Sequence, residues 1–221
     1  MARPIKTTKL KKNLRQFVLK ISGVTLVSIV TRNHAAGRAA IADMLETTTF
    51  NGVLVFTDQP AHFTGLGYFV VEPREYRQWC VWRMIELPKH RRRFNGHMLF
   101  VESDAAIVKP EAWLNEFLKW DYIGAPWHDD VVGNGGFCLM SQRLLAALEA
   151  LSLPPTETAC FPSDYKICRV YRRWLEQQDV KFAPLKIAQR FSSEQGPYTN
   201  SWGVHSYRGS QQKVIDEHKR I

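Results

Sequence analysis

Apolar runs that stop at polar residues recur in the first third of this chain and predict buried strands. The β-branched run Val24–Val30 predicts the first strand, and shorter runs at Val53–Phe56 and Tyr68–Val71 predict two more. Residues 35–47, between the first two runs, carry Ala and Leu at helical spacing. A strand, a helix and a strand of these lengths form a βαβ unit, so the pattern predicts a parallel sheet.

The same alternation continues through the rest of the chain. The apolar run His97–Val101 predicts a central strand, and Val180–Pro184 predicts a short strand further on. Pro110 suits the first turn of a helix, and Ser141 suits an N-cap. The helices predicted in this part of the chain cover residues 75–90, Pro110–Leu118, Ser141–Leu153 and 161–178.

Carboxylates follow the predicted central strand directly, in Glu102-Ser103-Asp104. In open α/β sheets, ligands bind in the crevice beyond the carboxyl ends of the strands. Two acids separated by one residue offer the hard oxygen ligands that hold Mg²⁺ or Mn²⁺. The alternative is that Glu102 and Asp104 are ordinary solvated residues after a strand, because so short a pattern is common.

Length and composition fit one domain with a packed core, because the chain has 221 residues of which 45% are hydrophobic. No run reaches the roughly 18 apolar residues of a membrane span. The four cysteines form no Cys-x-x-Cys pair, so we expect reduced buried thiols and a cytoplasmic location. The sequence has no Walker-type loop, Gly-x-Gly-x-x-Gly or Gly-x-Ser-x-Gly motif, so kinase, dehydrogenase and hydrolase chemistry lack support.

Positive charge is concentrated at the start of the chain. The net charge is +9, and residues 1–20 contain seven basic residues and no acid, which leaves +2 for the rest. We therefore predict a basic arm at 1–20, a folded domain at 21–210 and a polar tail at 211–221. Such an arm is usually solvated, and the alternative is contact with nucleic acid through counterion release.

Two segments carry a resemblance to a known family. Residues 100–145 read FVESDAAIVKPEAWLNEFLKWDYIGAPW and, after a short gap, VGNGGFCLMSQRLL, and residues 182–194 read FAPLKIAQRFSSE. Over roughly residues 24–208 the chain resembles a family of GT-A-fold glycosyltransferases with Asp-Tyr-Ile-Gly-Ala-Pro-Trp and Gly-Asn-Gly-Gly-Phe motifs. It departs from that family at Glu102-Ser103-Asp104-Ala105, where the family has Gln-x-Asp-Gly, and at Ser163, where the family has Glu. Both departures suggest a changed acceptor or a weakened enzyme.

The resemblance implies a fold and a donor. The fold would be α/β, a single GT-A-like (Rossmann-like) domain with a mainly parallel twisted sheet and helices on both faces. The donor would be a nucleotide-sugar, expected to be a UDP-sugar. Thr31, Arg32 and Asp58 follow predicted strands and are candidates, by position, for contacts to its base and ribose, although each could instead cap the following helix.

The resemblance also implies roles near the donor phosphates. Glu102, Asp104 and His205 would hold Mn²⁺ or Mg²⁺, although a histidine near the end of a chain could be an ordinary surface residue. The other residues that the resemblance places against the donor and its phosphates are Ser103, Gly135 and Gly136.

For the acceptor side, Asp164 at a helix start would be the general base of an inverting transfer, with an N-cap as the alternative. Tyr122 and Trp127 could stack on a sugar ring or could be buried anchors. Asn134 and Trp202 complete the set of expected substrate contacts.

The expected activity is metal-dependent hexosyl transfer to a hydroxyl, and the acceptor could be a hydroxyl-bearing modified base in DNA. A nucleic-acid-binding protein on an inactive transferase scaffold is one alternative. A glycosyltransferase for a protein or glycan acceptor is another, and a metal-dependent phosphoryl-transfer or nucleotidyl enzyme is the least favoured. The oligomeric state is left open by the sequence.

Overall fold

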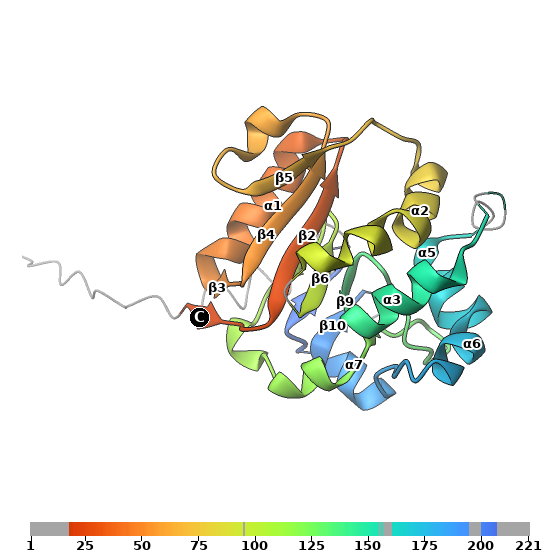
Figure 1. Ribbon diagram of the computed structural model, residues 1–221. Helices are drawn as coiled ribbons and strands as arrows, with labels where there is room; N and C mark the ends of the chain where they lie inside the picture. Colours follow the sequence, from red (N-terminus) through yellow and green to blue (C-terminus); the bar gives the residue numbers. More distant parts are fainter. Residues whose placement is uncertain (1–17, 95, 155, 157–160, 195–199, 207–221) are drawn as a thin grey trace, which may run out of the picture.

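Six strands form the central sheet, in the order β5-β4-β2-β6-β9-β8 (Figure 1). The computed structural model describes residues 18–94, 96–154, 156, 161–194 and 200–206. The strands of this sheet are β2 Val24–Val30, β4 Gly52–Thr57, β5 Gly67–Val70, β6 His97–Val101, β8 Tyr122–Gly124 and β9 Phe137–Met140. The predicted bounds of β2 and β6 are confirmed, because both are largely apolar and β-branched or bulky runs that the sheet buries.

The sheet is mixed, which corrects part of the predicted fold. β5, β4, β2 and β6 pair in parallel, but β9 pairs antiparallel with both β6 and β8. The cause is a hairpin-like return between β8 and β9, closed by a bridge between Pro126 and Val132. β8 is only three residues long and matches none of the predicted strands, so the sequence pattern gave no sign of the reversal.

Helices cover both faces of the sheet. The α-helices are α1 His34–Thr47, α2 Tyr76–Ile85, α3 Gln142–Leu151, α5 Ser163–Tyr165, α6 Arg172–Gln177 and α7 Leu185–Phe191. Successive side chains of a strand point to opposite faces. Val30 of β2 packs against Gly37 of α1, whereas its neighbour Ile29 lines a pocket with Trp79 of α2. The two helices therefore lie on opposite faces, as Figure 1 shows.

Two smaller sheets surround the central one. A three-stranded sheet joins β7 Ala106–Ile107, β11 Gly203–Val204 and β10 Ser192–Ser193. β7 and β11 are antiparallel, so the turn after β6 meets residues from the far end of the fold. Trp202, which is fully buried between Trp113 and Phe137, fixes this junction.

The second small sheet is a single pair of strands, and one of them lies within the predicted basic arm. β1 Leu19–Lys20 pairs in parallel with β3 Thr48–Thr49. The folded part therefore begins before the predicted boundary at residue 20. The rest of the arm, residues 1–17, lies outside the described residues, as does all of the predicted tail, residues 211–221.

Three predicted elements differ in detail from the structure. Pro110–Leu118 forms two short 3-10 turns, η3 Pro110–Ala112 and η4 Asn115–Lys119, because Trp113 between them is extended and packs on Trp202. The helix predicted over 161–178 contains a π-helical turn, η5 Lys166–Val170. Val180–Pro184 contributes only a single bridge, from Phe182 to Tyr122. The remaining 3-10 turns are η1 Pro60–Phe63 and η2 Leu87–Arg93.

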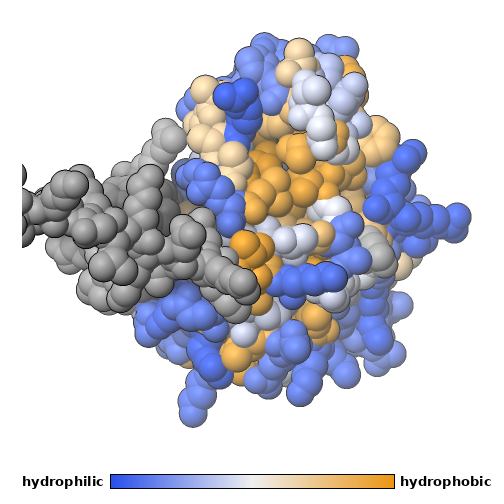
Figure 2. Space-filling view, turned by 90° about the vertical axis from the view of Figure 1, so that its left-hand side faces the viewer, coloured by the Kyte–Doolittle hydropathy of each residue, from blue (hydrophilic) through white to orange (hydrophobic). Residues whose placement is uncertain are grey.

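The edge strand β5 exposes apolar side chains, with Val70 64% exposed. Figure 2 shows apolar residues gathered on the side of the molecule where β4 and β5 lie.

Three of the four cysteines lie in the described part of the chain, and all three are buried free thiols, as predicted. Within the described residues, none of the helices is both long enough and apolar enough to cross a bilayer.

Candidate active site

Two carboxylates and an imidazole converge at the carboxyl end of β6. Glu102 and Asp104 lie in the turn after this strand, and His205 follows β11. The Nε2 atom of His205 is 3.3 Å from Asp104 Oδ1 and 3.6 Å from Glu102 Oε2. One potential ligand atom from each residue lies within 4.8 Å of the other two. The structure therefore brings together the three predicted metal ligands, although His205 lies about a hundred positions after the two acids in the chain.

The surroundings of His205 hold its ring in one orientation. Nδ1 lies 3.0 Å from Glu194 Oε1 and 2.9 Å from the side-chain nitrogen of Asn134. An Nδ1–H that donates to Glu194 leaves Nε2 directed at the two acids, which is how metal-bound histidines are usually oriented. Nε2 is buried and, among the described residues, faces the two acids without a hydrogen bond. The site thus holds an oriented nitrogen atom beside two hard oxygen donors.

Electrostatics favour positive charge at this point. Burial lowers the pKa of His205, but Asp104, Glu102 and Glu194 outweigh it and raise that pKa to about 11. Burial also raises the pKa of Glu102, yet His205 and Arg83 bring it below its usual value. Glu102 therefore stays ionised and the imidazole carries a balancing proton. A divalent cation bound between these residues would balance the same negative charge.

The glycine loop, residues 133–136, touches this cluster through its backbone. A Cβ on Gly136 would lie 2.1 Å from Nε2 of His205. The carbonyl of Gly136 accepts a hydrogen bond from the backbone N–H of Glu102 at 2.8 Å. A Cβ on Gly135 would lie 2.9 Å from both Arg83 Nη2 and Asp164 Cβ. The space beside Gly135 and Gly136 is therefore filled by the protein's own side chains.

Arg83 is a site residue that the sequence pattern did not reveal. Its Nη1 donates to Glu102 Oε1 at 3.2 Å and its Nη2 donates to the Gly135 carbonyl at 2.6 Å. The guanidinium also lies 3.9 Å from the centroid of the Phe100 ring. A signal did exist, because Tyr76, Trp79, Cys80 and Arg83 follow the i, i+3, i+4, i+7 spacing of one helix face.

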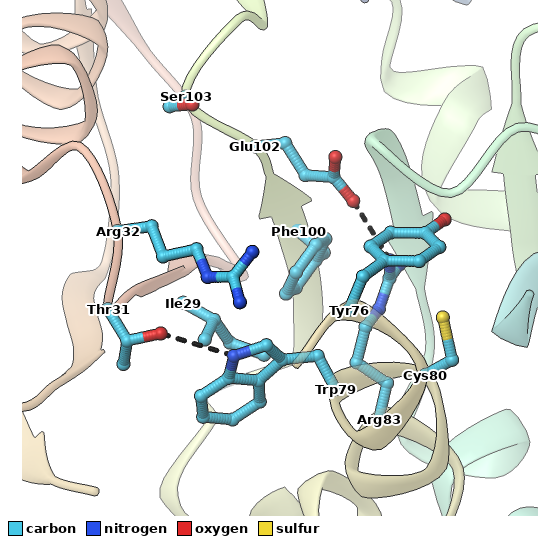
Figure 3. A pocket seen from close by; sticks show the side chains of 10 residues that line it. All are labelled: Ile29, Thr31, Arg32, Tyr76, Trp79, Cys80, Arg83, Phe100, Glu102 and Ser103. Carbon is cyan, nitrogen blue, oxygen red and sulfur yellow. Dashed lines mark hydrogen bonds and ion pairs between the residues drawn. The ribbon is translucent and has the colours of Figure 1, made fainter. Parts of the chain in front are cut away.

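That face of α2 forms one wall of a pocket of about 200 Å³ beside the acid cluster (Figure 3). Trp79 donates its indole N–H to Thr31 Oγ1 at 3.1 Å. Figure 3 shows Arg32 reaching in from the strand side, with Glu102 above it and Trp79 below. Four predicted donor contacts line this pocket, namely Thr31, Arg32, Glu102 and Ser103.

Four other predicted contacts have different surroundings. Asp58 does not line this pocket, and its Oδ1 is 2.7 Å from His34 Nε2. Tyr122 and Trp202 are fully buried. For Tyr122 this agrees with the alternative of a buried anchor that the sequence left open. Both rings fill the core, and the Tyr122 hydroxyl donates to the Asn134 carbonyl at 3.1 Å. Asn134 is 3% exposed and its side chain contacts Gly136 and His205, so it supports the site from behind rather than touching substrate.

Asp164 and Trp127 pack against the same glycine loop. Asp164, in the first turn of α5, accepts the Gly135 N–H at 2.8 Å and the Tyr165 N–H at 2.9 Å. Trp127 is half-buried, and its ring covers Gly133. The roles of Asp164 as general base and of Trp127 as a sugar contact remain predictions.

The family described as "Protein of unknown function (DUF5672)" matches residues 89–205, which is more than half of the chain. The chain belongs to this family. The matched region runs from η2 to His205, so it contains the acid cluster, the glycine loop and Asp164. No curated protein matches the chain.

One solved structure extends this result to the fold. It is the crystal structure of a glycosyltransferase involved in the glycosylation of the major capsid of PBCV-1. The two chains are 13% identical, with a TM-score of 0.51, and the match covers 90% of this chain and 99% of that chain. At this identity the likeness establishes a shared α/β fold.

Proposed function

We propose that this chain is a glycosyltransferase of the GT-A type that moves a sugar from a nucleotide-sugar to a hydroxyl with the help of a divalent cation. The observation that carries the proposal is the convergence of Glu102, Asp104 and His205 beside a pocket at the carboxyl edge of the sheet. Ligands of open α/β sheets bind at this edge. The fold shared with a glycosyltransferase supports the same reading.

The pocket suits the nucleoside part of the donor. Trp79 and Phe100 supply aromatic walls, and Thr31 supplies a hydroxyl held by the indole N–H. Arg32 supplies a cation at the rim, although its Nη2 is paired with Glu75 at 2.7 Å in the structure. A UDP-sugar placed with its base here would bring its diphosphate toward Glu102, which belongs to both the pocket and the acid cluster.

The donor set at the acid cluster suits Mn²⁺ or Mg²⁺. Carboxylate oxygens suit both ions, and a neutral imidazole suits Mn²⁺. A bound cation of this kind would neutralise the charge that develops on the leaving diphosphate. Glu194 and Asn134 would keep His205 oriented, and Arg83 would keep Glu102 ionised and in place.

Transfer would be a single inverting displacement. The acceptor oxygen bonds to the anomeric carbon while the bond from that carbon to the phosphate oxygen breaks. The bonding pair leaves with the nucleoside diphosphate, and the hydroxyl proton passes to Asp164. Backbone N–H groups hold both carboxylate oxygens of Asp164, and each oxygen keeps a second lone pair for that proton.

A thermal-shift panel of nucleoside diphosphates and nucleotide-sugars, each with and without Mn²⁺, tests the proposal. A ligand at about 100 times its dissociation constant adds about 2.7 kcal/mol to the free energy of unfolding. For a chain of this length that corresponds to about 5–11 °C in Tm. We expect such a shift for one sugar nucleotide and only with metal. A full panel without any shift would contradict the proposal.

The same panel also tests duplex DNA as a separate ligand. The basic residues that suggested a DNA acceptor fall almost entirely within residues 1–17, outside the described part of the chain. We propose DNA as an acceptor only if duplex DNA raises Tm together with a nucleotide-sugar. A shift with DNA and with none of the nucleotides would instead favour a nucleic-acid-binding protein on an inactive scaffold.

A further inference from the structure

We propose that the acceptor is a neutral saccharide, and that it binds on an aromatic platform formed by Trp127, Phe161 and Tyr165. This inference rests on the proposed glycosyl transfer and names the substrate class for the other side of the same site. The platform lies at the start of α5, beside the glycine loop that also packs against the acid cluster.

The three rings pack against one another. Phe161 and Tyr165 stack with centroids 5.0 Å apart and an interplanar angle of 21°. The Tyr165 and Trp127 centroids are 6.4 Å apart at 37°. Phe161 is 47% exposed and Tyr165 is 36% exposed, so part of each ring faces solvent. These exposed parts offer apolar surface to a ligand.

The platform borders the residues that would carry out the transfer. Tyr165 directly follows Asp164, whose carboxylate accepts the Gly135 N–H. The Trp127 ring lies so close to Gly133 that an added Cβ would be 2.4 Å from three of its ring atoms. A ligand lying on the rings is therefore placed next to the proposed general base and to the loop that supports the metal cluster.

Charge around the rings selects a neutral ligand. Arg169 lies 5.0 Å from the Trp127 centroid and 5.6 Å from the Tyr165 centroid, and its guanidinium is paired with Asp129. Lys166 lies 5.4 Å from the Phe161 centroid and is only 6% exposed. Both cations are engaged by rings or by an acid, so neither is directed outward at a phosphate.

Acids lie close by in the chain, because Asp130 is exposed on the loop after Trp127 and Asp164 lies at the helix start, while Asp129 is paired with Arg169. A nucleic-acid strand binds largely through cations that face its phosphates, and here its phosphates would meet carboxylates. The face of a pyranose is made of C–H groups and carries no charge. Its hydroxyls can donate to nearby carboxylates while the C–H face covers the rings, so the saccharide is the occupant that both features favour.

The test uses the full chain with Mn²⁺, UDP-hexoses as donors and a panel of acceptor probes. The panel contains methyl glycosides of glucose, galactose, mannose and N-acetylglucosamine, the disaccharides maltose, cellobiose and lactose, a single-stranded oligonucleotide and a serine-rich peptide. Two products are measured for each pair, namely the glycosylated acceptor and the free sugar released by hydrolysis of the donor. We expect transfer to at least one saccharide and to neither the oligonucleotide nor the peptide.

The variants Phe161→Ala and Tyr165→Ala connect that activity to the platform. Loss of one aromatic contact should lower the ratio of transfer to hydrolysis by about 3- to 10-fold. Val170→Ala is the matched control, because Val170 is equally exposed at 47% and lies on the adjoining π-helical turn. Its ratio should match that of the unaltered chain. A Phe161→Tyr variant restores the ring and should restore the ratio.

The outcomes separate the two proposals. Transfer to a saccharide that is insensitive to both alanine variants would overturn the platform but keep the enzyme. Transfer to the oligonucleotide or the peptide alone would overturn the saccharide acceptor. If no donor were bound or hydrolysed, the proposed function would fail first, and the acceptor role would fail with it. Saturation-transfer NMR on the same saccharides without donor then shows whether the chain binds sugar at all. The same measurement on the two alanine variants shows whether that binding depends on the rings.

Discussion

Adding one methyl group at Gly136 would place it inside the His205 imidazole. The new Cβ would lie 2.1 Å from Nε2 and 2.3 Å from Cε1, where unbonded carbon and nitrogen atoms need more than 3 Å. The ring has little room to retreat, because its Nδ1–H donates to Glu194 and the Asn134 side chain lies 2.9 Å from the same nitrogen. Gly136 does not have a positive φ, so alanine is tolerated by the backbone and only the side-chain clash acts.

Such overpacking typically costs about 1–3 kcal/mol. At about 2–4 °C per kcal/mol for a chain of this size, Gly136→Ala should lower Tm by about 2–12 °C. Because His205 has to move, Mn²⁺ should also lose its effect on donor binding. Both changes are measured in one experiment, by thermal unfolding with and without Mn²⁺ and a nucleotide-sugar.

Gly52→Ala is the matched control for this prediction. Gly52 lies in β4 with ordinary φ, and the nearest atom to an added Cβ is Thr25 Cγ2 at 3.8 Å, which is normal van der Waals contact. This variant should change Tm little and should keep the metal response. If Gly136→Ala behaved like Gly52→Ala in both readouts, the tight packing of glycine against imidazole would be refuted.

Three further predictions concern the same site. Asp104→Asn should abolish the dependence of donor binding on Mn²⁺, and retained dependence in a calorimetric titration would remove Asp104 from the ligand set. Asp164→Asn should leave donor binding intact and lower turnover by about 10²–10⁴-fold, because a positioned base contributes about that much; turnover within a few-fold of the unaltered chain would argue for another base. The pKa of His205 is raised to about 11, so its proton is bound at neutral pH and metal has to displace it. Binding of Mn²⁺ near pH 8 should therefore release about one proton, seen as a dependence of the binding enthalpy on the ionisation enthalpy of the buffer.

The parts of the fold that the sequence predicted are those governed by local periodicity. β2 and β6 were recognisable because each is a mostly apolar run that the sheet buries on both faces. The start of α3 was recognisable because Ser141 accepts the Leu144 N–H as a true N-cap. Because parallel strands end at one edge, the positions of Thr31 and Glu102 beside a common pocket followed from the same pattern.

The parts that the sequence missed depend on contacts between distant segments. The two-residue strands β7 and β11 are too short to show a period, yet their pairing is what brings Asp104 to His205. Burial of aromatic residues is equally invisible locally, since Tyr122 and Trp202 are core residues whereas Phe161 and Tyr165 are exposed. Arg83 was overlooked because a lone cation in an aromatic-rich helix has no partner in its own segment. Its partners lie on β6 and the glycine loop.

The glycine loop connects the two halves of the proposed chemistry. Gly136 packs against His205 on the metal side, and Gly133 packs against Trp127 on the acceptor side. Between them, Gly135 donates its N–H to Asp164 and gives its carbonyl to Arg83, which in turn holds Glu102. A side chain at any of these three glycines would push apart groups that have to meet for transfer. The repeated glycine in this loop therefore reflects three separate contacts, each between backbone and a different functional side chain, rather than flexibility of the loop.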